Sequence, residues 1–108
     1  MRKGSIVLVP FPFTDLSGQK IRPAIVLFAS ARGEDCIVAF ISSRAHKNKS
    51  LYDVPIRMSS ANGLKVDSVI KIDKLATLQK KIIIGELGVA DLDILQKVDI
   101  ALKKLLDL

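Results

Sequence analysis

The chain has 108 residues, of which 49% are hydrophobic and 26% charged, so we expect one globular domain spanning residues 1–108. Its single cysteine, Cys36, excludes an intramolecular disulfide and a zinc site built on several cysteines. No apolar stretch approaches the roughly 20 residues that a membrane helix needs. We therefore expect a cytoplasmic protein without membrane contact.

The net charge of +6 is unevenly distributed along the chain. Residues 1–81 hold 14 basic and 6 acidic residues, whereas residues 82–108 hold 3 basic and 5 acidic residues. A basic body of this kind indicates a polyanionic partner, of which nucleic acid is the most common. The alternative is a solvated, lysine-rich surface that only favours solubility.

Apolar segments typical of short strands fill the chain up to residue 87. In chain order they are 5–9, 23–28, 36–42, 53–58, 68–73 with a continuation through 74–78, and 82–87. The second and third segments are nearly continuous in apolar character, which predicts an antiparallel hairpin in the middle of a sheet. Pro55 lacks an N–H and marks the fourth segment as an edge strand.

From Asp91 the hydrophobic period changes to that of a helix, with Gly88 or Asp91 as the candidate cap. The apolar residues expected on one face are Leu92, Leu95, Val98, Leu102, Leu105 and Leu106. We expect this stripe to pack on the core, and the alternative is a contact with a partner subunit. Five to seven strands followed by one helix predict a mainly β protein, a small, strongly bent antiparallel sheet or barrel.

The sequence lacks the common enzyme motifs, with no P-loop, GxSxG or HExxH. Cys36 begins an apolar strand and is expected to be a buried small hydrophobe rather than a nucleophile. His46 is the only histidine and cannot form a metal site alone. We therefore expect no metal and no cofactor.

Arg22 stands where the first loop meets a strand, and Pro23 after it favours an extended backbone. In an antiparallel hairpin, Arg22 at the start of one strand and Ser42 at the end of the other lie at the same end of the sheet. An arginine so placed can hold a phosphate through two parallel hydrogen bonds. The alternatives are a structural ion pair and a solvated loop end.

The loop after Ser42 contains no acidic residue and adds positive charge to this end of the sheet. The residues expected in one patch with Arg22 and Ser42 are Ser43, Arg44, His46, Lys47 and Lys49. Phe11 and Phe13 in the first loop are candidate stacking surfaces for bases, or else pack beneath the loop. The patch therefore predicts binding of nucleic acid.

Four segments, in the same order, resemble the MazF/PemK family of toxin endoribonucleases from type II toxin–antitoxin pairs. They are KGSIVLVPFPFTDLSGQKIRPAIVL near the start, VAFISS, SSANGLKVDSVIKIDKLATL and the closing VADLDILQKVDIALKKLL. The resemblance covers nearly the whole chain. It implies a small SH3-like or CcdB-like barrel that forms a homodimer.

The resemblance also implies a reaction and its residues. Single-stranded RNA would be cleaved without metal, by attack of the ribose 2′-hydroxyl to give a 2′,3′-cyclic phosphate. The family's catalytic arginine falls on Arg22, and its catalytic hydroxyl residue, usually threonine, falls on Ser42. The RNA channel would be formed by Ser17, Gly18, Gln19, Lys20, Ser43, Arg44, His46, Lys47 and Lys49. A small antitoxin would inhibit the enzyme by laying an acidic segment along the basic groove.

The sequence departs from the family pattern at three places. Ser5 replaces a common aspartate, the loop carries Ser17 and Gln19 instead of the acidic residue that some relatives have there, and Ser42 replaces threonine. One alternative is therefore a barrel of the same fold that acts by binding, either as a gyrase-directed toxin or as an RNA-binding module. Another is a structural barrel that only dimerises.

Overall fold

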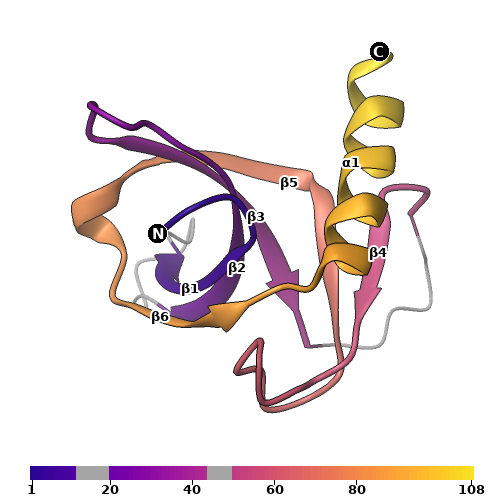
Figure 1. The fold of residues 1–108 in the computed structure, drawn as a ribbon, viewed down its shortest axis with the longest axis horizontal. Helices are drawn as coiled ribbons and strands as arrows, with labels where there is room; N and C mark the ends of the chain where they lie inside the picture. The colour runs from indigo at the N-terminus through magenta and orange to yellow at the C-terminus, as the bar shows by residue number, and fades with distance from the viewer. Residues whose placement is uncertain (12–19, 44–49) are drawn as a thin grey trace.

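The computed structural model describes residues 1–11, 20–43 and 50–108. Its strands are β1 (Ser5–Phe11), β2 (Lys20–Ala29), β3 (Asp35–Ser42), β4 (Asp53–Ile56), β5 (Ser68–Gln79) and β6 (Gly85–Val89). A short 3-10 helix, η1 (Lys80–Ile82), lies between β5 and β6, and the chain closes with helix α1 (Leu92–Leu106) (Figure 1).

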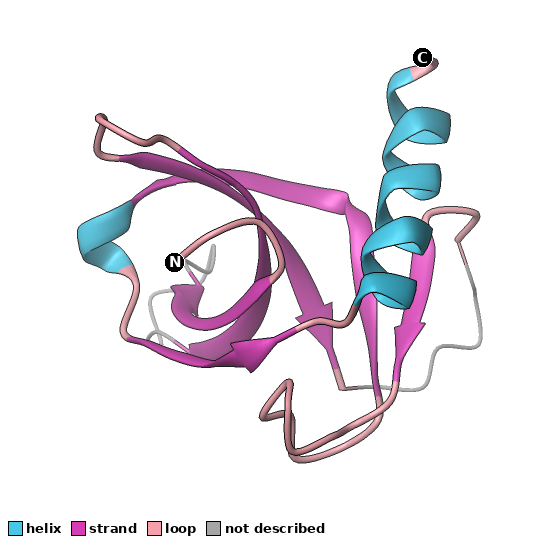
Figure 2. Ribbon diagram, in the orientation of Figure 1, coloured by secondary structure: helices cyan, strands magenta, loops and turns pink. Residues whose placement is uncertain are grey.

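The strands form one antiparallel sheet in the order β4-β5-β3-β2-β1-β6, which curls into a half-barrel (Figure 2). The expected hairpin of β2 and β3 does lie in the middle of this sheet. A register shift between Ala39 and Phe40 marks an irregularity in β5, and Figure 1 shows β5 bending sharply along its length. Such irregularities bend a strand and increase its local twist.

The expectation that β4 is an edge strand is confirmed. The N–H of Ile72 in β5 donates to the Tyr52 carbonyl at 3.1 Å. Because these bonds alternate along an antiparallel pair, the backbone nitrogens of Asp53 and Pro55 point away from β5. The Asp53 N–H instead donates to the Ser50 carbonyl at 3.2 Å, and Pro55 has no N–H. A further strand that approached this edge of the sheet would therefore find no free backbone N–H donor at Asp53 or Pro55.

Alternation along the strands divides the apolar residues between two faces of the sheet. The helix face carries Ile6, Ile25, Ala39, Ile41 and Ile70, which pack with α1 in one core. The barrel face carries Val7, Val9, Ala24, Val26 and Val38, which form a second core inside the curl. Both faces of β2 and β3 are therefore buried along much of their length, which explains their nearly continuous apolar sequence.

Helix α1 begins where the sequence predicted. Asp91 is its N-cap, and the Asp91 carboxylate accepts a hydrogen bond from the Ile94 N–H at 2.9 Å. The buried residues of the helix are Ile94, Val98 and Ala101.

The predicted apolar stripe was wrong at both of its ends, because Leu92 is 77% exposed and Leu106 is 54% exposed. Two residues turn a helix by about 200°, so Leu92 lies nearly opposite the buried Ile94. Figure 1 shows the last turn of the helix rising past the sheet, and Leu106 is the final residue of that turn.

The last strand also differs from its expected range of 82–87. The chain turns the corner between β5 and β6 through η1, in which the Ile83 N–H donates to the Lys80 carbonyl at 3.1 Å. Strand β6 therefore begins later, at Gly85, opposite Leu8 of β1. No helix in the described part of the chain is long and apolar enough to cross a membrane.

The two-core arrangement makes a testable prediction with a matched pair of isoleucines. Ile72 is fully buried in the core under α1, whereas Ile84 is 55% exposed. We expect Ile72→Ala to lower the free energy of unfolding by about 2–5 kcal/mol in urea titrations. Ile84→Ala is expected to change it by no more than about 0.5 kcal/mol. Equal effects of the two substitutions would contradict the assignment of the core.

Candidate functional site

The register of the central hairpin places Arg22 opposite Ser42. Ala24 pairs with Phe40 and Ile25 with Ala39, so continuing the pairing by two residues brings Arg22 to Ser42. Residues directly opposite in an antiparallel pair have Cβ atoms about 4.5–5.5 Å apart and point to the same face. The side chains of Arg22 and Ser42 therefore lie on one face at one end of the sheet, as the sequence predicted.

The neighbours of this pair show that it lies at the end of the barrel core. Arg22 is opposite Val9 of β1, which is fully buried, and Ser42 is opposite Val69 of β5. Arg22 is half-buried, and its Nε atom is shielded from solvent. A guanidinium stays charged at all physiological pH values, and its field is stronger near apolar walls than in water. Arg22 thus carries a fixed positive charge at the end of an apolar core.

The structure adds an ion pair that sequence reasoning missed. Lys71 of β5 lies opposite both Phe40 of β3 and Asp53 of β4, so these three residues form the row next to Ser42 on the same face. The Lys71 Nζ is 2.7 Å from the Asp53 Oδ1, with side-chain exposures of 15% and 8%. The other Asp53 oxygen accepts a hydrogen bond from the Ser50 N–H at 3.1 Å. Asp53 therefore holds the Lys71 ammonium in a fixed place beside the site.

Of the other expected RNA-binding residues, two lie in the described part of the chain. Lys20 begins β2 and is exposed, and Ser43 follows β3 directly and is exposed. Phe13 lies outside the described residues. So do the remaining expected RNA-binding residues, which are Ser17, Gly18, Gln19, Arg44, His46, Lys47 and Lys49. Lys20 and Ser43 lie at the same end of the hairpin as Arg22 and Ser42.

The prediction that Cys36 is a buried small hydrophobe is confirmed. Its side chain is inaccessible to solvent in the barrel core. Burial raises the pKa of the Cys36 thiol, and a nearby Lys80 opposes this shift only in part. A protonated, inaccessible thiol is not suited to nucleophilic attack. Within residues 1–11, 20–43 and 50–108, no three His, Cys, Asp or Glu side chains are grouped so that they could hold a metal ion.

The chemistry available at this end of the sheet is therefore that of cations and a hydroxyl. A guanidinium donates hydrogen bonds to two oxygens of one phosphate, and a serine hydroxyl can donate a third. Lys71 adds a second cation on the same face, with Asp53 as its counter-charge. Such an arrangement suits an anion whose charge increases during a reaction.

Comparison with known protein families finds one whose model matches nearly the whole chain. The model of a family described as PemK-like, MazF-like toxin of type II toxin–antitoxin system matches residues 2–106. Among curated proteins, no sequence match is found.

Solved structures share the fold at low sequence identity. One is an endoribonuclease in complex with its cognate antitoxin from a mycobacterial species, with 17% identity, a TM-score of 0.78, and coverage of 100% of this chain and 96% of that one. The Mycobacterium tuberculosis toxin MazF-mt6 has 20% identity, a TM-score of 0.77, and coverage of 96% and 97%. MazE-MazF (Form-III) from Deinococcus radiodurans has 23% identity, a TM-score of 0.76, and coverage of 100% and 97%. At these identities the similarity establishes a MazF-like fold.

The ion pair beside the site leads to a prediction about stability. Asp53→Asn leaves the Lys71 ammonium largely buried without its counter-charge, which should lower the free energy of unfolding by about 3 kcal/mol. Asp93→Asn is the matched control, because Asp93 is 70% exposed and its pair with Lys97 at 3.2 Å lies on the helix surface. We expect the control to change stability by less than about 0.5 kcal/mol. If both variants lost a similar free energy of unfolding in urea titrations, the buried Asp53–Lys71 pair would contribute no more to stability than the exposed pair.

Proposed function

Because the chain belongs to the PemK-like, MazF-like toxin family of type II toxin–antitoxin systems, we propose that it is an endoribonuclease that cleaves single-stranded RNA without a metal ion. The observation that carries this proposal is the β2–β3 register, which sets Arg22 opposite Ser42. The likeness to toxins solved as endoribonucleases supports the same reaction class.

In the proposed reaction, the ribose 2′-oxygen loses its proton and attacks the adjacent phosphorus. The bond from phosphorus to the 5′-oxygen of the next nucleotide breaks, and that oxygen gains a proton. The products are a 2′,3′-cyclic phosphate and a 5′-hydroxyl. Negative charge builds up on the non-bridging oxygens along this path, so donors aimed at them stabilise the transition state more than the substrate.

Each residue has a proposed role that follows from its position. The Arg22 guanidinium binds the phosphate and offsets its growing charge, and Ser42 donates a hydrogen bond to a non-bridging oxygen. The Lys71 ammonium, held by Asp53, is a further hydrogen-bond donor on the same face. A single preorganised donor of this kind contributes about a hundredfold to a thousandfold in rate.

The RNA would reach this site through a channel at the same end of the hairpin. Lys20 and Ser43 are the described residues of this proposed channel. The others would be Ser17, Gly18, Gln19, Arg44, His46, Lys47 and Lys49, which supply most of its positive charge. We also propose that the protein works as a cytoplasmic homodimer, and that a cognate antitoxin inhibits it.

Cleavage of a long single-stranded RNA in the presence of EDTA tests the proposal. We expect Arg22→Ala and Ser42→Ala each to lower kcat/KM by about a hundredfold or more, whereas Ser42→Thr keeps the hydroxyl and most of the activity. Arg32→Ala is the matched control, because this exposed arginine lies in the β2–β3 turn, at the opposite end of the hairpin. We expect it to cleave like the wild type.

Three results would count against this function. The first is RNA that stays intact with the wild-type protein, and protection of the RNA in that case would favour the binding module. The second is equal cleavage by Arg22→Ala and the wild type. The third is a product whose 3′ end is not a cyclic phosphate. Circular dichroism of each variant checks that the fold is retained.

A further inference from the structure

Phe40 stands where the barrel core meets the proposed site. Successive side chains of a strand alternate between faces, so Phe40 points to the same face as Val38 before it and Ser42 after it. Val38 is inaccessible to solvent, whereas Phe40 and Ser42 are half-buried. The core therefore reaches the surface as an aromatic ring, whose Cα lies about 7 Å along the strand from that of Ser42.

The neighbours of Phe40 across the sheet are a small residue and a tethered cation. Phe40 lies between Ala24 of β2 and Lys71 of β5. Ala24 carries only a methyl group, which is too short to extend over the ring. The Lys71 ammonium is bound to Asp53 at 2.7 Å, and β4, which carries Asp53, lies on the side of β5 away from Phe40. The exposed part of the ring therefore opens toward the face that carries Arg22 and Ser42.

The other described aromatic side chains do not share this face. Phe28 pairs with Ile37, which is an odd number of residues from Phe40 and so points to the opposite face. Tyr52 packs against the core under α1. In the part of the chain that the structure describes, Phe40 is thus the aromatic side chain beside the guanidinium and the hydroxyl of the proposed site.

This combination of groups is typical of proteins that hold single-stranded nucleic acid. Their cationic side chains contact phosphates, and their aromatic rings stack on bases that are free of a partner strand. Arg22 offers the first contact and Phe40 the second, from adjacent strands and on one face. A nucleotide whose phosphate lies between Arg22 and Ser42 carries its base to one side, where Phe40 is the next residue of β3.

We propose that Phe40 stacks on a base that flanks the phosphate held by Arg22 and Ser42. That this phosphate belongs to an RNA that is cleaved rests on the proposed function, but the stacking does not require cleavage. Because every base has a π-face, the contact supplies affinity and position without selecting a sequence.

Two labelled single-stranded oligomers of eight nucleotides serve as probes. One is oligo-deoxyadenylate, and the other is an abasic oligomer in which tetrahydrofuran replaces every nucleoside sugar and base. They carry the same phosphate charge, so a difference in their affinities is due to the bases. Neither has a 2′-hydroxyl, so the proposed reaction cannot cleave them. Binding is measured by fluorescence anisotropy at low salt.

Matched phenylalanine variants isolate the ring. Phe40→Leu keeps most of the apolar volume but has no π-face, so it should weaken binding of oligo-deoxyadenylate at least fivefold and that of the abasic oligomer less than twofold. Phe28→Leu is the control, because Phe28 is 52% exposed at the opposite end of the hairpin. It should bind both oligomers like the wild type. Urea unfolding checks that both variants are folded.

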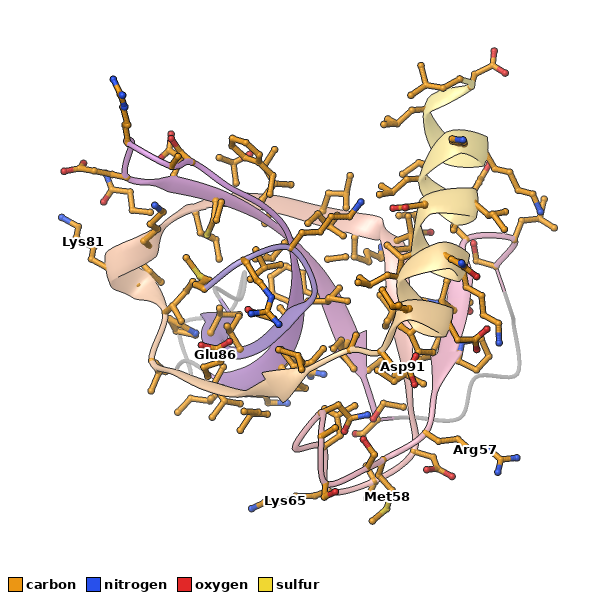
Figure 3. All side chains as sticks on the ribbon, viewed as in Figure 1. Arg57, Met58, Lys65, Lys81, Glu86 and Asp91 are labelled. Carbon is orange, nitrogen blue, oxygen red and sulfur yellow. The ribbon has the colours of Figure 1, made fainter. Side chains whose placement is uncertain are left out.

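A second pair of variants separates the phosphate contact from the base contact. Arg22→Ala should weaken binding of both oligomers to the same extent, because a guanidinium that holds a phosphate does not sense the base. Lys81→Ala is the control, because the Lys81 side chain extends from the corner at η1 into solvent (Figure 3). It should change neither affinity by more than twofold.

A tryptophan reporter tests the stacking directly. The chain contains no tryptophan, so Phe40→Trp places a single fluorophore at the proposed contact. Its emission should be quenched by oligo-deoxyadenylate and not by the abasic oligomer. Phe28→Trp should be quenched by neither.

Contrary outcomes overturn the stacking. If Phe40→Leu weakened binding of both oligomers equally, the ring would act only through the packing of the site. If it weakened neither, or if the tryptophan at position 28 were quenched as strongly as that at position 40, no base would stack on Phe40. RNA that stays intact would overturn the proposed function and leave these readouts unaffected. Cleavage by the wild type with unchanged oligomer binding by Phe40→Leu would overturn the stacking alone.

Discussion

The antiparallel register between β2 and β3 is the constraint on which the arrangement of the site depends. These strands occupy the centre of the sheet and are buried on both faces. A shift of the pairing by one residue would turn one of the two strands over; if that strand were β2, Val26 would leave the barrel core and Ile25 would leave the core under α1. Two independent cores therefore hold the same register. The position of Arg22 opposite Ser42 follows from packing far from either residue.

The same register keeps a charge in a place that would otherwise favour apolar residues. Arg22 lies on the barrel face with Ala24 and Val26, and it is opposite the fully buried Val9. An arginine can occupy such a position because its long side chain lets the charged end reach the rim while the stem stays among apolar atoms. In the proposed reaction this matters because a charge among apolar walls acts on a phosphate more strongly than one in open water.

The fold was largely predictable because its signals are local. The strand-like runs and the change of period at Asp91 are visible in the sequence, and so is the loss of the N–H at Pro55. The corner at Lys80–Ile82 was missed because the following isoleucines look like a strand and carry no turn signal. Leu92 and Leu106 were placed on the wrong side because spacing alone does not show where a helix axis meets the sheet.

The site was only partly predictable for a different reason. Arg22 and Ser42 could be paired because a hairpin fixes which strand ends meet. The pairing of Asp53 with Lys71 could not be predicted, because it depends on the register between β4 and β5. A separate register shift between Ala39 and Phe40 of β3 sets which residues of β5 face Phe40 and Ser42.

The most direct test of this account is a disulfide trap across the hairpin, made in a Cys36→Ala background. The double variant Arg22→Cys with Ser42→Cys should oxidise readily to an intramolecular disulfide. Directly opposed residues have Cα atoms about 4.5–5.5 Å apart, within the range that a disulfide spans. The double variant Arg22→Cys with Ser43→Cys should not, because its thiols would point to opposite faces. Mass spectrometry that finds the second disulfide but not the first would contradict the register, and with it the pairing of guanidinium and hydroxyl.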